Sequence, residues 1–157
     1  MPKKKFKIPL NKEVIQTRIA YIEDSLRSLE RFKGIPLKQF HSNSDNFRIA
    51  FYDLHRALEA VMDIGSHILS RVPGARPSSY KDIPRLLEKY KIIPIDFALN
   101  QLTKMAGYRN RMVHFYGEIT EEEIYYIIQE ELEDFYTFCS FVSKILKDPS
   151  KFNLTIE

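Results

Sequence analysis

The chain has 157 residues, of which 44% are hydrophobic and 13% aromatic; this suits one compact domain and excludes a disordered or multidomain protein. The formal net charge is +3, but Lys3, Lys4, Lys5 and Lys7 open the chain, and beyond them 20 basic residues stand against 21 acidic ones. That balance excludes the broad basic surface of a protein that binds duplex nucleic acid by charge alone.

Cysteine use and hydropathy indicate the compartment. The single cysteine, Cys139, has no partner for an intramolecular disulfide, as is typical of a reducing environment. The Lys-rich start lacks the apolar stretch of a signal peptide, and no later run of residues is long and apolar enough to span a membrane. The spacings of zinc sites, Rossmann folds and P-loops are missing as well. We expect a cytoplasmic protein without membrane insertion, metal or cofactor.

The first half of the chain has apolar residues at helical spacing. A stripe from Ile15 to Leu29 predicts a helix over residues 12–32, which Gly34 and Pro36 end. A second stripe predicts a long helix over residues 44–71 after a cluster of N-cap residue types. The Pro- and Gly-containing stretch 73–79 predicts a loop.

The second half continues the pattern with three more helices. Asp82 and Pro84 favour a short helix over 82–90, and Pro94 opens a helix over 95–115. Thr120 and Glu123 form a capping box, which predicts a final helix to residue 147.

We therefore predict an all-α fold, an up-and-down bundle of four long helices plus one short helix. The helical domain covers residues 12–147, between a basic N-terminal tail (1–11) and a C-terminal tail (148–157). The wide apolar and aromatic stripes of so short a chain leave a face for a second copy, so we expect a homodimer.

The fourth predicted helix, 95–115, breaks its own apolar pattern at Arg109. A guanidinium in an apolar stripe costs several kcal/mol unless it is paired or faces a cleft or an anion. The structural alternative is an Arg that extends to the rim of the core or pairs with a carboxylate from another helix. Asn110 and His114 follow on one helix face, and the helix dipole favours an imidazolium at His114. An Arg beside a His suits proton transfer at a phosphodiester, because the Arg stabilises the charge on its oxygens.

The stretch GYRNRMVHFYGEIT (107–120) resembles the signature of the HepT-like toxins of the HEPN superfamily, in which Arg is followed after four to six residues by His, any residue and Tyr. Arg109, His114 and Tyr116 match it, and Asn110 matches the polar residue that often follows the Arg. The segments ALEAVMDIGSHIL, PSSYKDIPRLLEKYKIIP and EITEEEIYYII resemble the family in the same order, so the resemblance covers roughly residues 12–146.

The resemblance implies a dimeric, all-helical endoribonuclease that needs no metal, the toxin of a type VII toxin–antitoxin system. In such enzymes the 2′-hydroxyl attacks the adjacent phosphorus and leaves a 2′,3′-cyclic phosphate and a 5′-hydroxyl. By carry-over, His114 is the acid/base, Arg109 binds the phosphate and the transition state, and Asn110 orients one of them. The family's partner is a minimal nucleotidyltransferase antitoxin, which adds AMP to the motif's Tyr, here Tyr116.

The second predicted helix has a polar ladder of His55, Glu59, Asp63 and His67. At helical rise these four residues spread over about 18 Å, too far for one metal ion, so we expect a polar face supported by side-chain pairs. We leave these four residues out of the predicted site. The alternative is that Asp63 or His67 faces the cleft that contains His114.

Several other features favour structural roles. Eight acidic residues and no basic ones lie between Glu118 and Asp134; we expect a solvated face, with a basic patch of the antitoxin as the alternative contact. The tyrosines 125, 126 and 136 are expected to pack in the core and at its rim, the Lys-rich start to be a solubilising tail, and Cys139 to be no nucleophile.

Two other functions fit the same residues. The chain is either a non-catalytic helical partner of a nucleotidyltransferase, or a module that binds RNA or nucleotides through Arg109 and Arg111 without chemistry. Loss of His114 separates both from the nuclease, because only the nuclease requires a group that moves protons.

Overall fold

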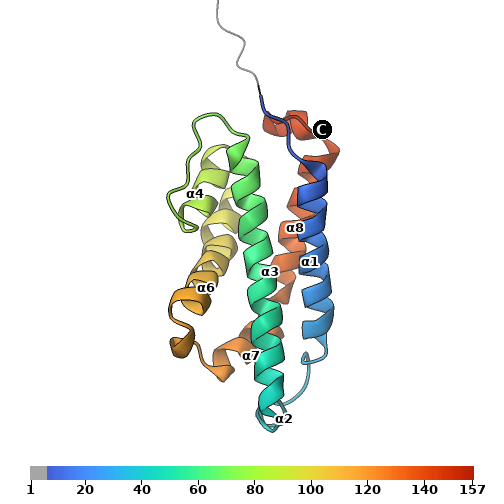
Figure 1. The fold of residues 1–157 in the computed structure, drawn as a ribbon, viewed down its shortest axis with the longest axis vertical. Helices are drawn as coiled ribbons and strands as arrows, with labels where there is room; N and C mark the ends of the chain where they lie inside the picture. Colours follow the sequence, from blue (N-terminus) through green and yellow to red (C-terminus); the bar gives the residue numbers. More distant parts are fainter. Residues whose placement is uncertain (1–6) are drawn as a thin grey trace, which may run out of the picture.

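The computed structural model describes residues 7–157, so most of the predicted N-terminal tail lies outside the described residues. The fold is all-α, and Figure 1 shows an elongated bundle whose long helices run nearly parallel to its long axis. In residues 7–157 the β-type pairing is limited to an isolated bridge between Leu10 and Ile156. None of the described helices combines the length and the apolarity that a bilayer crossing requires.

The elements follow the chain from α1 to a C-terminal 3-10 turn. They are α1 (Lys12–Glu30), α2 (Leu37–His41), α3 (Ser44–Ser70), α4 (Asp82–Lys89), α5 (Ile95–Phe97), a π-helical segment (Ala98–Leu102), α6 (Thr103–His114), a 3-10 turn (Tyr116–Glu118), α7 (Glu121–Glu130), α8 (Leu132–Lys147) and a 3-10 turn (Pro149–Phe152).

Most of the predicted helix boundaries are confirmed to within two residues. Two of the predicted N-caps also form. The side chain of Asn43 accepts a hydrogen bond from the backbone N–H of Asp45 at 3.0 Å, where the N-cap cluster was noted. Thr120 Oγ1 accepts from the N–H of Glu123 at 3.1 Å. The reciprocal half of the predicted capping box is not formed, because the carboxylate of Glu123 binds Arg111 instead.

Three local features differ from the prediction. The final helix is broken at Glu131, whose φ of −124° is not helical, and the apolar stripe continues on both sides of the break, so spacing does not reveal it. The short helix α2 was not predicted because only Phe40 is buried in it. The helix predicted over 95–115 contains a π-helical segment. Directly after it, Thr103 Oγ1 donates to the carbonyl oxygen of Ala98 at 2.9 Å.

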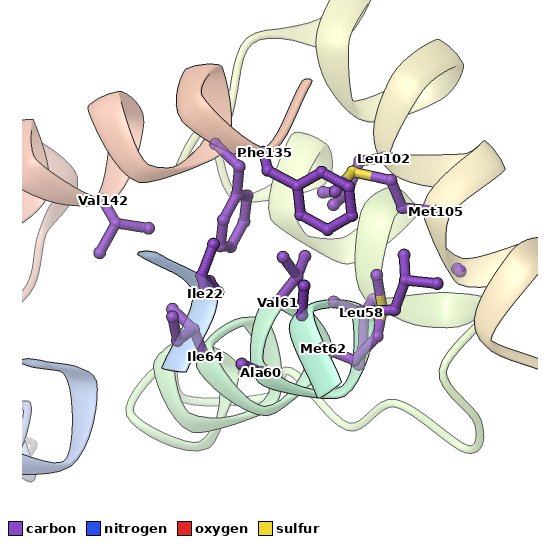
Figure 2. Packing of buried hydrophobic residues seen from close by; sticks show 14 of the residues in the cluster. Ile22, Leu58, Ala60, Val61, Met62, Ile64, Leu102, Met105, Phe135 and Val142 are labelled. Carbon is purple, nitrogen blue, oxygen red and sulfur yellow. The ribbon is translucent and has the colours of Figure 1, made fainter. Parts of the chain in front are cut away.

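The helix α3 is the centre of the bundle. It packs against α1 along most of its length and also contacts α2, α4, α6, α7 and α8. Its buried residues therefore point to several sides, and Figure 2 shows Leu58, Val61 and Met62 among side chains from α6 and α8. Nearly every residue of the predicted stripes is buried, which fixes the face that each helix turns to the core.

A close approach of α3 and α4 sets the place of the loop between them. A Cβ atom at Gly65 would lie 2.6 Å from Cγ2 of Ile83, closer than real side chains come. Glycine therefore allows α4 to lie directly on α3. This contact holds the preceding loop, with Tyr80 and Lys81, beside the end of α6 that carries the predicted motif.

The two chain ends meet, so parts of both predicted tails belong to the packed domain. Leu10 is fully buried and Leu154 nearly so. The backbone N–H of Leu10 donates to Thr155 at 2.8 Å, and that of Glu157 donates to Leu10 at 3.1 Å. The start of α1 is also tied to α3, because the N–H of Asn11 donates to Nε2 of His67 at 3.1 Å.

This last bond predicts a pH-dependent stability. Burial, and then the charge of Arg71, lower the pKa of His67 below 6.5, so the unfolded chain takes up this proton before the folded one does. The contribution of His67 to stability is complete above the unfolded pKa and is lost as the pH falls from that value through the lower pKa of the folded state. In urea titrations at about pH 7.5 and about pH 5.5, we expect the free energy of unfolding to fall more for the wild type than for His67→Gln. Equal falls would contradict this account of His67.

A second prediction concerns Cys139 of α8, which packs against the core. Burial raises the pKa of its thiol to about 11, so the reactive thiolate is scarce at neutral pH. We expect iodoacetamide to modify the folded protein far more slowly than the same protein in urea, as followed by intact mass. Modification at the same rate in both states would show that Cys139 is accessible and activated.

Candidate functional site

Part of the predicted motif lines a hollow between the end of α6 and the loop before α4. The hollow has a volume of about 430 Å³ and is lined by Ser79, Tyr80, Lys81, Arg109, Asn110, His114 and Phe115. Three residues that the sequence singled out, Arg109, Asn110 and His114, therefore lie around one space. The other lining residues come mainly from the loop that α4 holds in place.

Arg109 has the carboxylate partner that its position in the apolar stripe requires. Its Nε donates to Oε1 of Glu59 on α3 at 2.7 Å, and its Nη1 donates to Oδ1 of Asn110 at 3.2 Å. The guanidinium carbon lies 4.1 Å from the ring centroid of Tyr80, within the range of a cation–π contact. The side chain is only 17% exposed. Arg109 is thus held on two of its nitrogen atoms and on one face.

The residues that hold Arg109 have further partners. Glu59 Oε1 lies 3.4 Å from Nε2 of His55, one turn earlier on α3. The hydroxyl of Tyr80 donates to Oδ1 of Asp63 at 3.4 Å, and Oδ2 of Asp63 lies 3.3 Å from Nε of Arg18 on α1. A chain of polar contacts therefore connects α1, α3, the loop and α6.

Burial controls the titration of the Tyr80–Asp63 pair. Desolvation raises the pKa of the Asp63 carboxyl, and the charge of Arg18 opposes this effect. Desolvation also raises the pKa of the Tyr80 hydroxyl, and the nearby carboxylates of Glu59 and Asp63 add to the shift. Tyr80 is therefore a neutral hydrogen-bond donor at physiological pH.

His114 occupies the last turn of α6 and is exposed to solvent, unlike Arg109. Met112, two residues before it, is buried in the core and anchors this end of the helix. The helix ends there, and the N–H of Phe115 donates to the carbonyl oxygen of Arg111 at 2.8 Å. The imidazole thus borders the hollow on a rigid element but stays within reach of a ligand from solvent.

The backbone of Tyr116 forms the 3-10 turn that follows α6, two residues beyond His114. Its side chain lies outside the described part of the structure, so the prediction for its hydroxyl stays a prediction.

The polar ladder on α3 was underestimated from the sequence. The predicted side-chain pairing is confirmed between His55 and Glu59, and His67 contacts Asn11 rather than the hollow. Glu59 and Tyr80, however, were missing from the predicted site although they contact Arg109 directly. Arg109 in an apolar stripe indicated that a carboxylate partner was needed, but spacing within one helix did not identify which one.

Arg111 lies on another side of α6 and has a different partner. Its two terminal nitrogens donate to the carboxylate of Glu123 at 2.7 and 3.0 Å. Glu123 is therefore ion-paired, although its side chain is still 39% exposed. The expectation of a solvated acidic face is wrong for Glu131, which is 8% exposed and accepts from Lys104 at 2.7 Å and from Tyr108 at 3.3 Å. These contacts tie α6 to α7 and α8, and they leave Arg109 as the arginine at the hollow.

The sequence is similar to a known family and to two proteins named as nucleases. The family described as ribonuclease HepT-like matches residues 22–142. The tRNA nuclease HepT of Aphanizomenon flos-aquae is 30% identical over 124 residues, which cover 78% of this chain and 82% of that protein. The mRNA nuclease HepT of Shewanella oneidensis is 30% identical over 132 residues, which cover 83% and 96% respectively.

A comparison of structures gives the same result. The tri-AMPylated HEPN toxin of Shewanella oneidensis, solved in complex with an MNT antitoxin, superposes with a TM-score of 0.75 at 28% identity. The match covers 85% of this chain and 98% of that one. With the family matched over most of the helical domain, with similar relatives and with a shared fold, the chain belongs to the ribonuclease HepT-like family.

Proposed function

We propose that the protein is a cytoplasmic endoribonuclease, the toxin of a type VII toxin–antitoxin pair, and that it cleaves RNA without a metal ion. The observation that carries this proposal is the hollow that Arg109, Asn110 and His114 line together. The nuclease names of the two relatives support RNA as the substrate class.

The reaction uses the RNA's own 2′-hydroxyl as nucleophile. Its oxygen bonds to the neighbouring phosphorus while the bond from phosphorus to the 5′-oxygen breaks, and the products are a 2′,3′-cyclic phosphate and a 5′-hydroxyl. His114 acts as the acid/base at the oxygens that lose and gain a proton. Arg109 binds the non-bridging oxygens and stabilises the charge that grows in the transition state. Because the nucleophile belongs to the substrate, the pathway does not need a metal-activated water.

Asn110 has a supporting role at Arg109. Its Oδ1 accepts from Nη1 of Arg109 at 3.2 Å, and both residues are on the last two turns of α6. This contact orients the guanidinium from within the same helix.

The proposed partner is a minimal nucleotidyltransferase antitoxin that adds AMP to Tyr116. The relative that is an AMPylated HEPN toxin bound to an MNT antitoxin supports this pairing. An AMP group on Tyr116 adds a bulky anion two residues beyond His114 in the chain, and this anion competes with the phosphates of RNA.

We also propose a homodimer that brings two such sites together. Val113 and Phe115 flank His114 in the chain and are 37% and 55% exposed. Apolar side chains at this end of α6 favour a protein partner, because a second copy would bury them.

The first prediction here is that wild-type protein cleaves total cellular RNA in the presence of EDTA and that His114→Ala does not. Removal of a general acid or base typically lowers the rate by about 10²–10⁴-fold, so cleavage falls below detection in a short incubation. His41→Ala is the control, because His41 pairs with Glu121 and Glu122 away from the hollow. Gel analysis measures cleavage, and end-group analysis identifies the cyclic phosphate.

Other results would favour the rival functions. Equal cleavage by wild type and His114→Ala would remove His114 from the reaction. Binding of RNA without cleavage, preserved in His114→Ala and lost in Arg109→Ala, would indicate a binding module. Neither binding nor cleavage by protein shown to be free of AMP would leave the non-catalytic partner of a nucleotidyltransferase.

The second prediction is that co-expression with a minimal nucleotidyltransferase antitoxin adds the mass of one or more AMP groups to the protein, and that Tyr116→Phe abolishes the gain. The phenolic oxygen is the acceptor, and phenylalanine lacks it. Tyr52→Phe is a matched control, since Tyr52 is 63% exposed on α3 and should not change the modification. An unchanged mass gain in Tyr116→Phe would place the modification on another residue.

A further inference from the structure

We propose that Glu59 and Tyr80 are positioning residues, which hold the guanidinium of Arg109 ready for an RNA phosphate before the substrate binds. The inference rests on the proposed function, but it concerns residues outside the predicted motif. Glu59 comes from α3 and Tyr80 from the loop before α4.

The contacts leave one end of the guanidinium available. Glu59 occupies Nε at 2.7 Å, Asn110 occupies Nη1 at 3.2 Å, and the ring of Tyr80 covers one face at 4.1 Å. Among the side chains that the structure describes, which do not include that of Tyr116, none forms a hydrogen bond with Nη2 of Arg109. Arg109 also lines the hollow with Lys81, so a phosphate entering there meets two cationic side chains.

An unanchored arginine would be a poor ligand at this place. Its flexible side chain loses rotamer entropy when it is fixed, and a substrate that orders it must supply this free energy on binding. At Arg109 the folded protein has already ordered the side chain, because it is only 17% exposed and has partners on α3, α6 and the loop. Prior ordering matters most in the transition state, where small displacements of a charged group cost rate.

The anchors are themselves held, which distinguishes them from a chance surface pair. The carboxylate of Glu59 is 28% exposed and also contacts His55. Tyr80 donates to Asp63, and Asp63 contacts Arg18 of α1. The position of the guanidinium therefore depends on the packing of α1, α3 and α4, not only on α6.

The test separates positioning from a general loss of stability. Glu59→Ala removes the acceptor, whereas Glu59→Gln keeps an oxygen that can accept from Nε. Tyr80→Leu removes the aromatic face, whereas Tyr80→Phe keeps it. The matched control is Glu123→Ala, which breaks the neighbouring ion pair of α6, Arg111 with Glu123, also at 2.7 Å. Melting temperatures are recorded for all variants.

We expect Glu59→Ala and Tyr80→Leu to lower kcat/KM for RNA by about tenfold to a hundredfold, through a higher KM as well as a lower kcat. Glu59→Gln, Tyr80→Phe and Glu123→Ala should stay within a few fold of the wild type. In the Arg109→Ala background, Glu59→Ala should cause no further loss, because the residue that it positions is gone. Loss of activity that follows the melting temperature, or that adds to the loss in Arg109→Ala, would overturn the proposal.

A binding assay separates this inference from the proposed function. Affinity for a 2′-O-methyl RNA oligonucleotide, which cannot be cleaved by 2′-hydroxyl attack, should fall on Glu59→Ala and recover on Glu59→Gln. If the wild type cleaves RNA but Glu59→Ala behaves like it in both assays, the inference alone is wrong. If the wild type binds this RNA through Arg109 without cleaving any RNA, the nuclease proposal is wrong and the positioning proposal is still judged by binding. If the wild type neither cleaves nor binds, both are wrong.

Discussion

The ion pair between Arg109 and Glu59 reconciles two opposing demands on α6. The helix must turn an apolar stripe to the core, with Met105 and Met112, and the same stripe contains a charged guanidinium. Removing one partner of such a partly buried pair leaves a charge without compensation, which costs several kcal/mol when burial is complete and less here, where Glu59 is 28% exposed. The pair therefore fixes how α6 meets α3.

The rest of the bundle supports this contact. The central helix α3 offers Glu59 to α6 while its other faces pack against α1, α4 and α8. Gly65 lets α4 lie close enough for the loop before it to place Tyr80 on the guanidinium. On the far side, the ion pairs of Arg111 with Glu123 and of Lys104 with Glu131 hold α6 against α7 and α8. The hollow beside His114 thus lies between elements that are each fixed by contacts with other parts of the bundle.

The sequence predicted the helices well and the site only in part, for physical reasons. Helical spacing depends on which face is buried, so the stripes of α1, α3, α6 and α8 could be read directly. The break at Glu131 left no trace in that spacing, because Ile128 and Leu132 are buried on either side of it. Arg109 showed that a partner was required. Glu59 lies fifty residues away in the chain, and only the tertiary structure shows that it, rather than Asp63, meets Nε.

The most direct test of the account removes a single oxygen atom from the substrate. One cleavage position is first mapped in a cellular RNA, and a short oligonucleotide that spans it is prepared with and without the 2′-hydroxyl at the nucleotide on the 5′ side of the cut. The account predicts that wild-type protein cuts the all-ribose oligonucleotide at this position and does not cut the one that lacks this hydroxyl. Cutting of both at the same position would contradict it, because the nucleophile would then be water and not the RNA.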